Sequence, residues 1–444
     1  MDTTTQDRQA GKEAAPAGKG GTTSMVDTMV CKYDGIVTAD WDGLFAERID
    51  GMKGSAIREL LKVTEMPDVI SFAGGLPAPE VFPVREFKEA CNFVLEEIGA
   101  RALQYGPTEG YPPLKDYLVD KMKRYGVPVE PGNILLTNGS QQALDLVGKL
   151  FIHQGDLVLT ESPTYVGALQ AFNAYQPNYV TIPMDDNGMR VDMLDNLLAR
   201  HKVKFIYVLP NFQNPSGVTL SLERRFQLAE VAAEHGIIIV EDDPYGELRF
   251  EGENLTSLIV IHKENVLYLG TFSKTLAPGI RLGWVVAPQK VIQKMVLAKQ
   301  GTDLHTGTFV QMVAYDICQR GILREHVKLI RDVYRERRDV MLRAMAKHFP
   351  VGVTWTHPEG GLFLWVTLPE HVDADELLKV AIEEKVAFVP GANFFPEGGG
   401  HNTMRLNFSN ARPELIDEGI KRLGRALMRE FGCEAPGPEA CRAE

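Results

Sequence analysis

The chain has 444 residues, 44% of them hydrophobic and 24% charged, which is ordinary for a soluble globular protein of two domains. Its formal net charge of −12 argues against nucleic acid as a partner, because nucleic-acid binders usually carry basic patches and no long Lys/Arg run appears. No apolar run approaches the about 20 residues that a membrane span needs, and the N-terminus lacks the apolar core of a signal peptide. The five cysteines are scattered and show no Cys-x-x-Cys pair or His/Cys metal spacing. We therefore expect a cytoplasmic protein with reduced thiols, no metal site and no membrane partner.

The N-terminal part of the chain predicts a tail, a helix and an arm. Residues 1–35 are rich in Gly, Ala, Thr and Lys, so we expect a disordered tail. Residues 44–63 have a mostly helical pattern, with Gly51 and Gly54 as weak points. The Gly/Pro-rich residues 72–79 predict an extended arm that lines a substrate pocket.

Between residues 133 and 288, short apolar runs rich in β-branched residues alternate with helical ones. This alternation indicates βαβ units and an α/β fold with a mostly parallel, seven-stranded sheet. The expected strands are residues 133–137, 157–160, 178–183, 204–209, 236–241, 265–270 and 282–287. Ligands bind such sheets at the carboxyl ends of the strands, which makes the turns after these runs candidate sites.

The turns after the first two expected strands suit a phosphate and a flat ring. Gly139 permits a tight turn, and Ser140 and Gln141 then fall at a helix N-terminus, where free N–H groups and the helix dipole favour a phosphate. Taken alone, this pattern is also that of a plain helix cap. Tyr165 follows the second strand and can stack on an aromatic ring, although a half-buried tyrosine is the simpler interpretation.

The next two turns carry groups that can bind a protonated pyridine ring. Asn214 precedes a proline, which holds it extended so that its amide can point into a site. Asp242 lies at the end of a buried strand, where a carboxylate can pair with a pyridine nitrogen and keep the ring cationic. Tyr245, three residues on, can donate a hydrogen bond to a phenolic oxygen of the ring. An Asn-Pro turn and an acidic loop are the ordinary alternatives.

The turn after the sixth expected strand is the most informative. It contains two hydroxyls, Thr271 and Ser273, then Lys274, and seven residues later Arg281. A buried lysine amine can bond covalently to an aldehyde, and hydroxyls with an arginine can hold a phosphate. An aldehyde and a phosphate together describe pyridoxal phosphate (PLP). A solvated lysine in a surface turn would be the better interpretation if this turn stood alone, but all these groups follow successive strand ends.

The rest of the chain predicts a smaller α+β domain. Residues 309–348 form one long helical stretch that leads into it, and the charge run at residues 331–338 is most simply a solvated face. We expect strands at residues 353–355, 362–368, 387–389 and 404–408, and helices near residues 374–384 and 413–430. The expected organisation is a tail at residues 1–35, a helix and arm of the small domain at 36–80, a large PLP-binding domain at 81–335, the C-terminal small domain at 336–430 and a tail at 431–444.

Over roughly residues 51–430 the chain resembles the fold-type I, class I/II PLP-dependent aminotransferases. The motifs that carry the resemblance are Asn214-Pro-Ser-Gly217, Asp242 with Tyr245, and Thr271-Phe-Ser-Lys274. The first hydroxyl of the last motif is a threonine where the family has serine. The resemblance implies that Arg281 binds the phosphate and that Arg405 binds the substrate α-carboxylate. It also implies a homodimer in which Tyr105 reaches the phosphate of the other subunit.

Within this family, residues 54–62 and the arm at residues 72–79 resemble the 2-aminoadipate aminotransferase branch. The resemblance implies that Ser55 and Arg58 contact the distal group of the substrate, with Gly75 of the arm beside it. Close relatives in the branch accept aromatic and branched amino acids, kynurenine among them, so broad specificity is expected.

The implied reaction is a ping-pong transfer of the amino group of an L-amino acid to 2-oxoglutarate. Lys274 would act as the base at the α-carbon, Asp242 would keep the cofactor ring protonated, and Asn214 would lie beside both cofactor and substrate. Three alternatives remain open. A PLP-dependent lyase or decarboxylase uses the same scaffold, a transcription regulator can carry an aminotransferase-like domain, and a nicotinamide-dependent oxidoreductase is also α/β. The regulator would need an extra basic N-terminal domain, and no Gly-x-Gly-x-x-Gly follows a strand as the oxidoreductase would require.

Overall fold

The computed structural model describes residues 39–49, 51, 52, 54 and 68–431. The chain separates into two compact units, residues 1–47 and residues 48–444. In its described part, the first unit contains one 3-10 turn, η2 (Asp42–Leu44), and η3 (Glu47–Ile49) lies at the boundary. The helix expected over residues 44–63 is therefore wrong for the described residues up to Gly54, where glycines at positions 51 and 54 disfavour a continuous helix. The remainder of that expected helix, with Ser55 and Arg58, lies outside the described residues.

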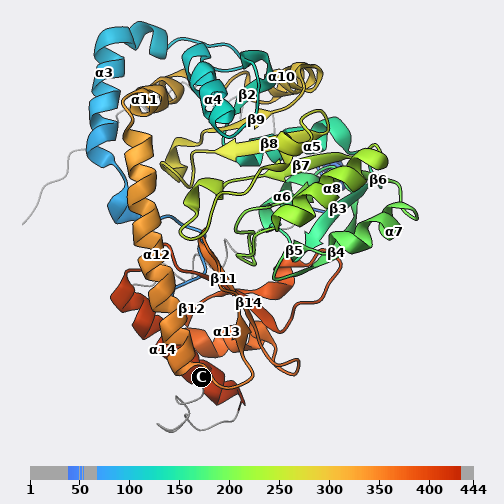
Figure 1. Cartoon of the computed structure of the whole chain (residues 1–444), viewed down its shortest axis with the longest axis vertical. Coiled ribbons are helices and arrows are strands. Elements are labelled where there is room, and N and C mark those ends of the chain that lie inside the picture. The colour runs from blue at the N-terminus through green and yellow to red at the C-terminus, as the bar shows by residue number, and fades with distance from the viewer. Residues whose placement is uncertain (1–38, 50, 53, 55–67, 432–444) are drawn as a thin grey trace, which may run out of the picture. The chain divides into compact units, whose positions relative to one another are not determined.

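The second unit is built around a sheet of eight strands (Figure 1). Its strands are β2 (Ile134–Thr137), β3 (Leu157–Ser162), β4 (Asn178–Asp185), β5 (Gly188–Met189), β6 (Val203–Val208), β7 (Ile238–Asp242), β8 (Val266–Thr271) and β9 (Gly283–Val286). All seven expected strands are present, and β5 is a two-residue addition at the edge. The strand order of the sheet is β2-β9-β8-β7-β6-β3-β4-β5. The central strands β4, β3, β6, β7 and β8 pair in parallel, whereas β9, β2 and β5 pair antiparallel. The α/β, mostly parallel architecture is thus confirmed.

Successive residues of each strand enter two different hydrophobic cores, because side chains of a strand point alternately to the two faces of the sheet. In β7, Val240 packs into the first core and Ile239 into the second. In β8, Leu267 and Leu269 belong to the first core and Tyr268 to the second. Asp242 follows Val240 by two residues and so shares the face of the first core.

Helices cover both faces of the sheet (Figure 1). Those that contribute to the first core beside the sheet are α5 (Ser140–Phe151), α6 (Val166–Asn173) and α10 (Gln289–Asp303). Those that contribute to the second core are α3 (Val84–Ala102), α4 (Pro112–Arg124), α7 (Leu194–Leu198), α8 (Leu222–Glu234), α9 (Leu258–Ile261), α11 (Thr308–Gln319) and the beginning of α12 (Ile322–His348). Short 3-10 turns connect them, namely η4 (Pro79–Val81), η5 (Pro131–Asn133), η6 (Val191–Met193), η7 (Gly246–Leu248) and η8 (Pro278–Ile280).

The C-terminal region forms a small antiparallel sheet with its own helices. Its strands are β10 (Thr354–Trp355), β11 (Phe363–Thr367), β14 (Thr403–Asn407) and β13 (Val389–Pro390), in that order, with η9 (Gly391–Phe394) after β13. Helices α13 (Ala374–Glu383) and α14 (Pro413–Phe431) accompany it. The N-terminal arm joins this region, since β1 (Ile70–Ser71) pairs in parallel with β12 (Val386–Ala387). The expected α+β region is therefore present, while the residue limits of the domains stay a prediction.

The helical stretch expected at residues 309–348 is two helices rather than one. The second, α12 (Ile322–His348), is the long orange helix that runs toward α14 in Figure 1. The break lies at Gly321, whose φ of +75° is left-handed and does not continue an α-helix.

The charge run at residues 331–338 is not a simple solvated face. Arg337 and Arg338 are both buried, and they form ion pairs with Glu80 and Glu251 respectively. Arg337 also donates to the backbone of Ser409 at 2.5 Å, so its guanidinium ties the arm to the C-terminal region. The carboxylates and carbonyl oxygens around these two side chains offset the cost of burying them.

None of the helices in the described residues is long and apolar enough to span a membrane. Within the same residues, no group of His, Cys, Asp and Glu side chains is arranged to hold a metal ion.

Candidate active site

Lys274 lies in the turn after β8, and its side chain reaches the arm. Its Nζ donates a hydrogen bond to the carbonyl oxygen of Gly75 at 2.8 Å. Burial, together with the positive charges of Arg405 and Arg281, lowers the pKa of Lys274 to about 8. A lysine in this state holds a nucleophilic, neutral amine at a pH where most lysines are protonated.

Asp242 ends β7 and is buried with one oxygen free. Tyr207 of β6 donates from Oη to Asp242 Oδ2 at 2.9 Å. Asp242 Oδ1 has no hydrogen-bond partner among the described residues. Burial raises the pKa of Asp242 to about 7. The hydrogen bond from Tyr207 lowers this pKa, and the negative charge of Asp243 raises it. The free oxygen is positioned for a donor that the protein itself does not supply.

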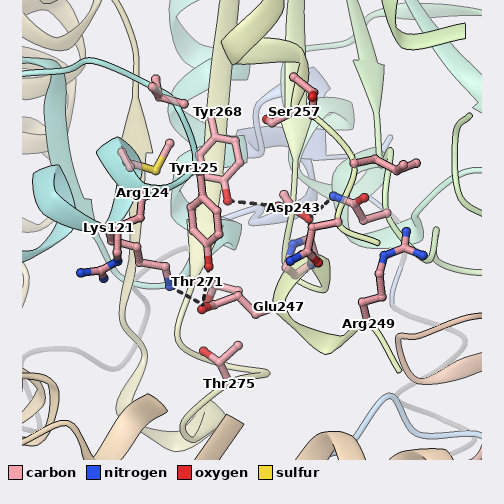
Figure 2. Close-up of a pocket in the computed structure, with 18 of the residues that line it drawn as sticks. Lys121, Arg124, Tyr125, Asp243, Glu247, Arg249, Ser257, Tyr268, Thr271 and Thr275 are labelled. Carbon is pink, nitrogen blue, oxygen red and sulfur yellow. Dashed lines mark hydrogen bonds and ion pairs between the residues drawn. The ribbon is translucent and has the colours of Figure 1, made fainter. Parts of the chain in front are cut away.

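Asp243, the neighbouring carboxylate, is occupied by protein groups (Figure 2). It accepts from Tyr268 Oη at 3.1 Å, from Asn211 Nδ2 at 2.9 Å and from the backbone N–H of Gly246 at 2.9 Å. These groups line a cavity of about 340 Å³ that does not include Lys274. In this cavity Lys121 and Tyr125 both donate to Glu247. Of the two adjacent aspartates, only Asp242 lines the same cavity as Lys274 and has an unpaired carboxylate oxygen among the described residues.

Arg405 of β14 is held in a buried position beside Asn214. Its Nη1 donates to Asn214 Oδ1 at 2.8 Å and its Nη2 donates to the carbonyl oxygen of Ala73 at 2.7 Å. The guanidinium carbon lies 4.3 Å from the centre of the Phe363 ring, a cation–π contact. Its Nε has no partner among the described residues, and burial lowers the pKa of Arg405 to about 10. A carboxylate is the natural ligand for such a guanidinium.

The turn before α5 forms a cradle in which only glycine fits. Gly139 has φ +74°, and a Cβ on it would lie 2.8 Å from Nη2 of Arg281. Ser140 is the first residue of α5, so backbone N–H groups at this end have no helical acceptor. Opposite, the hydroxyls of Thr271 and Ser273 lie 3.0 Å apart and form a hydrogen bond. Such a cluster of donors suits a phosphate.

One cavity of about 130 Å³ gathers most of the residues expected from the sequence. Those that line it are Ser140, Gln141, Tyr165, Asn214, Asp242, Tyr245, Thr271, Ser273, Lys274 and Arg281. Gly75 and Arg405 form hydrogen bonds with Lys274 and Asn214 of this set, and Gly139 directly precedes Ser140. Burial raises the pKa of both Tyr165 and Tyr245, so both phenols stay protonated.

One expected site residue is not brought to this cavity, and two lie outside the described residues. Tyr105 is 78% exposed and stacks edge-on against His305 with a ring separation of 5.7 Å. Ser55 and Arg58 lie outside the described residues.

Three further residues shape the site, and no motif in the sequence predicts them. Tyr207 pairs with Val240 and thus shares the face of Asp242, a relation that depends on the register of β6 against β7 and not on a motif in either strand. Gln213 donates to Glu161 and to the carbonyl of Pro163, which joins the turns that carry Asn214 and Tyr165. Neither Gln213 nor Phe363, which stacks on Arg405, has a signal in the local sequence.

The family model described as aminotransferase class I and II matches residues 68–423. The chain belongs to the class I and II aminotransferases. An aromatic-amino-acid aminotransferase from Thermococcus litoralis is 49% identical over 401 residues, 89% of this chain and 96% of that protein. A 2-aminoadipate transaminase from Thermus thermophilus is 45% identical over 391 residues, 87% and 97% of the two chains. The crystal structure of an alpha-aminoadipate aminotransferase from the same organism, complexed with N-(5'-phosphopyridoxyl)-L-leucine, matches with a TM-score of 0.84 at 43% identity, covering 89% and 100% of the chains.

This aminotransferase is a PLP-dependent enzyme, and the residues of its cavity fit that cofactor. The free Oδ1 of Asp242 lacks the donor that a protonated pyridine nitrogen would provide. The glycine cradle beside Arg281 and the two hydroxyls leave donors for a phosphate. When bound, PLP supplies an electron sink for the bonds at the α-carbon of an amino acid.

Proposed function

We propose that Lys274 carries the cofactor and moves the proton at the α-carbon of the substrate. One observation carries this proposal: the buried Nζ of Lys274, with its pKa lowered to about 8, lines the same cavity as the unpaired Oδ1 of Asp242. A neutral amine accepts a proton, and a pKa close to the working pH lets it return that proton. Asp242 keeps the ring nitrogen of the cofactor protonated.

Other residues of the cavity bind and orient. Arg405 binds the α-carboxylate of the substrate through its guanidinium, which is buried beside Phe363 and whose Nε has no partner among the described residues. Asn214 and Tyr245 donate to the ring oxygen, and Tyr165 stacks on the ring. The phosphate lies among Gly139, Ser140, Gln141, Thr271, Ser273 and Arg281.

The test is chemical trapping of the cofactor. Borohydride reduction of the purified protein, followed by peptide mass mapping, should place a pyridoxyl group on Lys274. The Lys274→Ala protein, treated in the same way, should carry no label. A label on another lysine of the wild-type protein would remove the assignment.

The substrates we propose are 2-aminoadipate-like L-amino acids, together with aromatic and branched ones, and 2-oxoglutarate as acceptor in a ping-pong reaction. The two curated relatives support this range, since one is named for aromatic amino acids and the other for 2-aminoadipate. Ser55 and Arg58 would bind the distal group of the substrate, beside the arm residue Gly75.

Arg58→Ala tests this range. A charged hydrogen bond contributes about 1.5–3 kcal/mol, so kcat/KM for 2-aminoadipate and glutamate should fall roughly ten- to a hundredfold. The values for leucine and phenylalanine serve as the internal control and should barely move. Equal losses on both substrate types would make Arg58 structural.

We further propose a cytoplasmic homodimer with shared active sites. The exposure of Tyr105 supports this arrangement, because a tyrosine that leaves its ring in solvent in one subunit is available to another. A lyase on the same scaffold, which the cofactor residues alone permit, has no observation in its favour.

A further inference from the structure

Four polar side chains behind the cavity form a closed network. Asp303, the last residue of α10, accepts from Asn138 Nδ2 at 2.5 Å, from Gln142 Nε2 at 2.6 Å and from Lys299 Nζ at 2.8 Å. Lys299 Nζ also donates to Gln142 Oε1 at 2.7 Å. None of these four residues lines the cavity of the candidate active site.

The network contains a charge that the protein has taken fully out of solvent. The side chain of Lys299 is 0% exposed, and that of its partner Asp303 is 22% exposed. A buried ion pair costs desolvation energy that an apolar pair would not, so it is weak evidence for stability by itself. A role in fixing one arrangement of the backbone explains its presence better.

The backbone that it fixes is the glycine cradle. Asn138 immediately precedes Gly139. Its side chain donates to Asp303, and its backbone N–H donates to Gln142 Oε1 at 2.9 Å. The carbonyl oxygen of Asn138 lies 3.4 Å from Nη2 of Arg281, which donates to it. The orientation of Asn138 therefore sets the direction of the next two peptide N–H groups and the place of the guanidinium.

We propose that Asp303 and Lys299 are positioning residues that hold the turn at residues 137–140 in the conformation that binds the phosphate of the cofactor. The inference rests on the proposed phosphate site and adds residues that touch neither cofactor nor substrate. Through Asn138 they set how tightly the phosphate is bound, and they leave the bond between Lys274 and the aldehyde unaffected.

Paired titrations with PLP and with pyridoxal, which lacks the phosphate, test the proposal on the full-length apoprotein. Asp303→Asn removes the charge at the centre of the network. Asn138→Ala removes one link and leaves the Lys299–Asp303 pair intact, so it covers the case in which Asp303→Asn does not fold. Thr302→Ala is the matched control. Thr302 directly precedes Asp303 in α10 and accepts an exposed hydrogen bond from Lys149 Nζ of α5 at 2.8 Å, so the variant breaks a bond between the same two helices outside the network.

In both network variants the dissociation constant of PLP should rise by roughly tenfold, since each loses a hydrogen bond to a charged group. The dissociation constant of pyridoxal should stay within about twofold of the wild-type value, and Thr302→Ala should change neither. Unchanged PLP affinity in both variants would overturn the proposal, as would equal losses for PLP and pyridoxal, which mark a purely structural network. A wild-type protein that binds neither compound would instead overturn the proposed function, and this inference with it.

Discussion

Asp242 makes the stability of the cofactor-free protein depend on pH. Burial raises its pKa from 3.8 to about 7. Between these values the folded protein holds a proton that the unfolded chain has released. The contribution of Asp242 to the free energy of unfolding therefore falls as the pH rises from about 4 to 7, and this contribution is level above that range.

Asp242→Asn should remove this dependence, because the amide needs no proton and still accepts from Tyr207. The free energy of unfolding of the apoprotein variant should exceed that of wild type by about 2 to 3 kcal/mol more at pH 8 than at pH 5. This figure comes from the two pH units between pH 5 and the folded-state pKa of about 7, at about 1.4 kcal/mol each. Urea unfolding at a fixed protein concentration measures this difference. Glu230→Gln, at an exposed position on α8, is the control, and an Asp242→Asn gain that is equal at both pH values would contradict the assignment.

Tyr207 offers a second test at the scale of the residue. Its hydroxyl is the hydrogen-bond donor to Oδ2 of Asp242, and its removal leaves a buried carboxylate oxygen unsatisfied. Tyr207→Phe should raise the pKa of Asp242 further and lower kcat by roughly threefold to tenfold, with a smaller change in KM.

Tyr268→Phe is the matched control for this change. Tyr268 lies on β8, which flanks β7 on the side away from β6; it faces the opposite side of the sheet and donates to Asp243 instead. Steady-state kinetics of both variants separate the two aspartates. Equal losses of kcat would show that Tyr207 acts through the fold and not through Asp242.

At the scale of the element, Gly321 divides α11 from α12. Its φ is +75°, and a Cβ would meet nothing within 4 Å, so any cost of a side chain comes from the backbone alone. Gly321→Ala should lower the free energy of unfolding by about 1 kcal/mol and leave kcat unchanged.

Gly301→Ala in α10 is the same substitution in the opposite context. Gly301 is helical and exposed, and its Cβ would also meet nothing within 4 Å. It should raise the free energy of unfolding by up to about 1 kcal/mol. Urea unfolding of both variants at one protein concentration checks the predicted opposite signs, and a shared sign would refute the argument from φ.

A helix, strand or break can be predicted from the sequence only where neighbouring residues determine it. The central strands could be predicted because runs such as residues 237–240 are apolar and β-branched by themselves. The break at Gly321 could not be separated from a helical glycine, since its φ depends on how α12 packs. The burial of Arg337 and Arg338 depends on Glu80 and Glu251, which are distant in the sequence.

At the scale of the whole molecule, the proposed dimer can be tested by complementation. If each site takes Tyr105 from the partner, a mixture of Lys274→Ala and Tyr105→Ala subunits contains heterodimers with one intact site. With random pairing, activity should recover to about a quarter of the wild-type value. A mixture of Lys274→Ala and Asp242→Ala is the control, because these two residues line one cavity of the same chain and no intact site can form.

Subunits refolded together and assayed by 2-oxo acid formation measure the recovery. If neither mixture recovers activity, and light scattering shows that the fully active wild-type protein is a monomer, the shared site is refuted.

Of the active site as a whole, sequence motifs predicted most of the residues that line the cavity, because all of these except Arg281 lie at or soon after the carboxyl end of a strand. They could not predict the residues behind it. Tyr207 lies inside a strand that reads as ordinary core, and Gln213 acts by joining two turns about 50 positions apart in the chain. Such residues become visible only when the strands are side by side.

The two faces of β7 have a consequence for how this enzyme can change by insertion and deletion. Glu241 accepts from Ser257 and from the first backbone N–H groups of α9, while Asp242 faces Lys274 on the other side. A deletion of one residue within β7 would exchange the two carboxylates between faces, and so would remove the helix anchor and the cofactor partner at once. A deletion of two residues preserves the alternation and shortens only the strand. Natural length variation in this strand should therefore occur in steps of two, and libraries for engineering can be restricted in the same way.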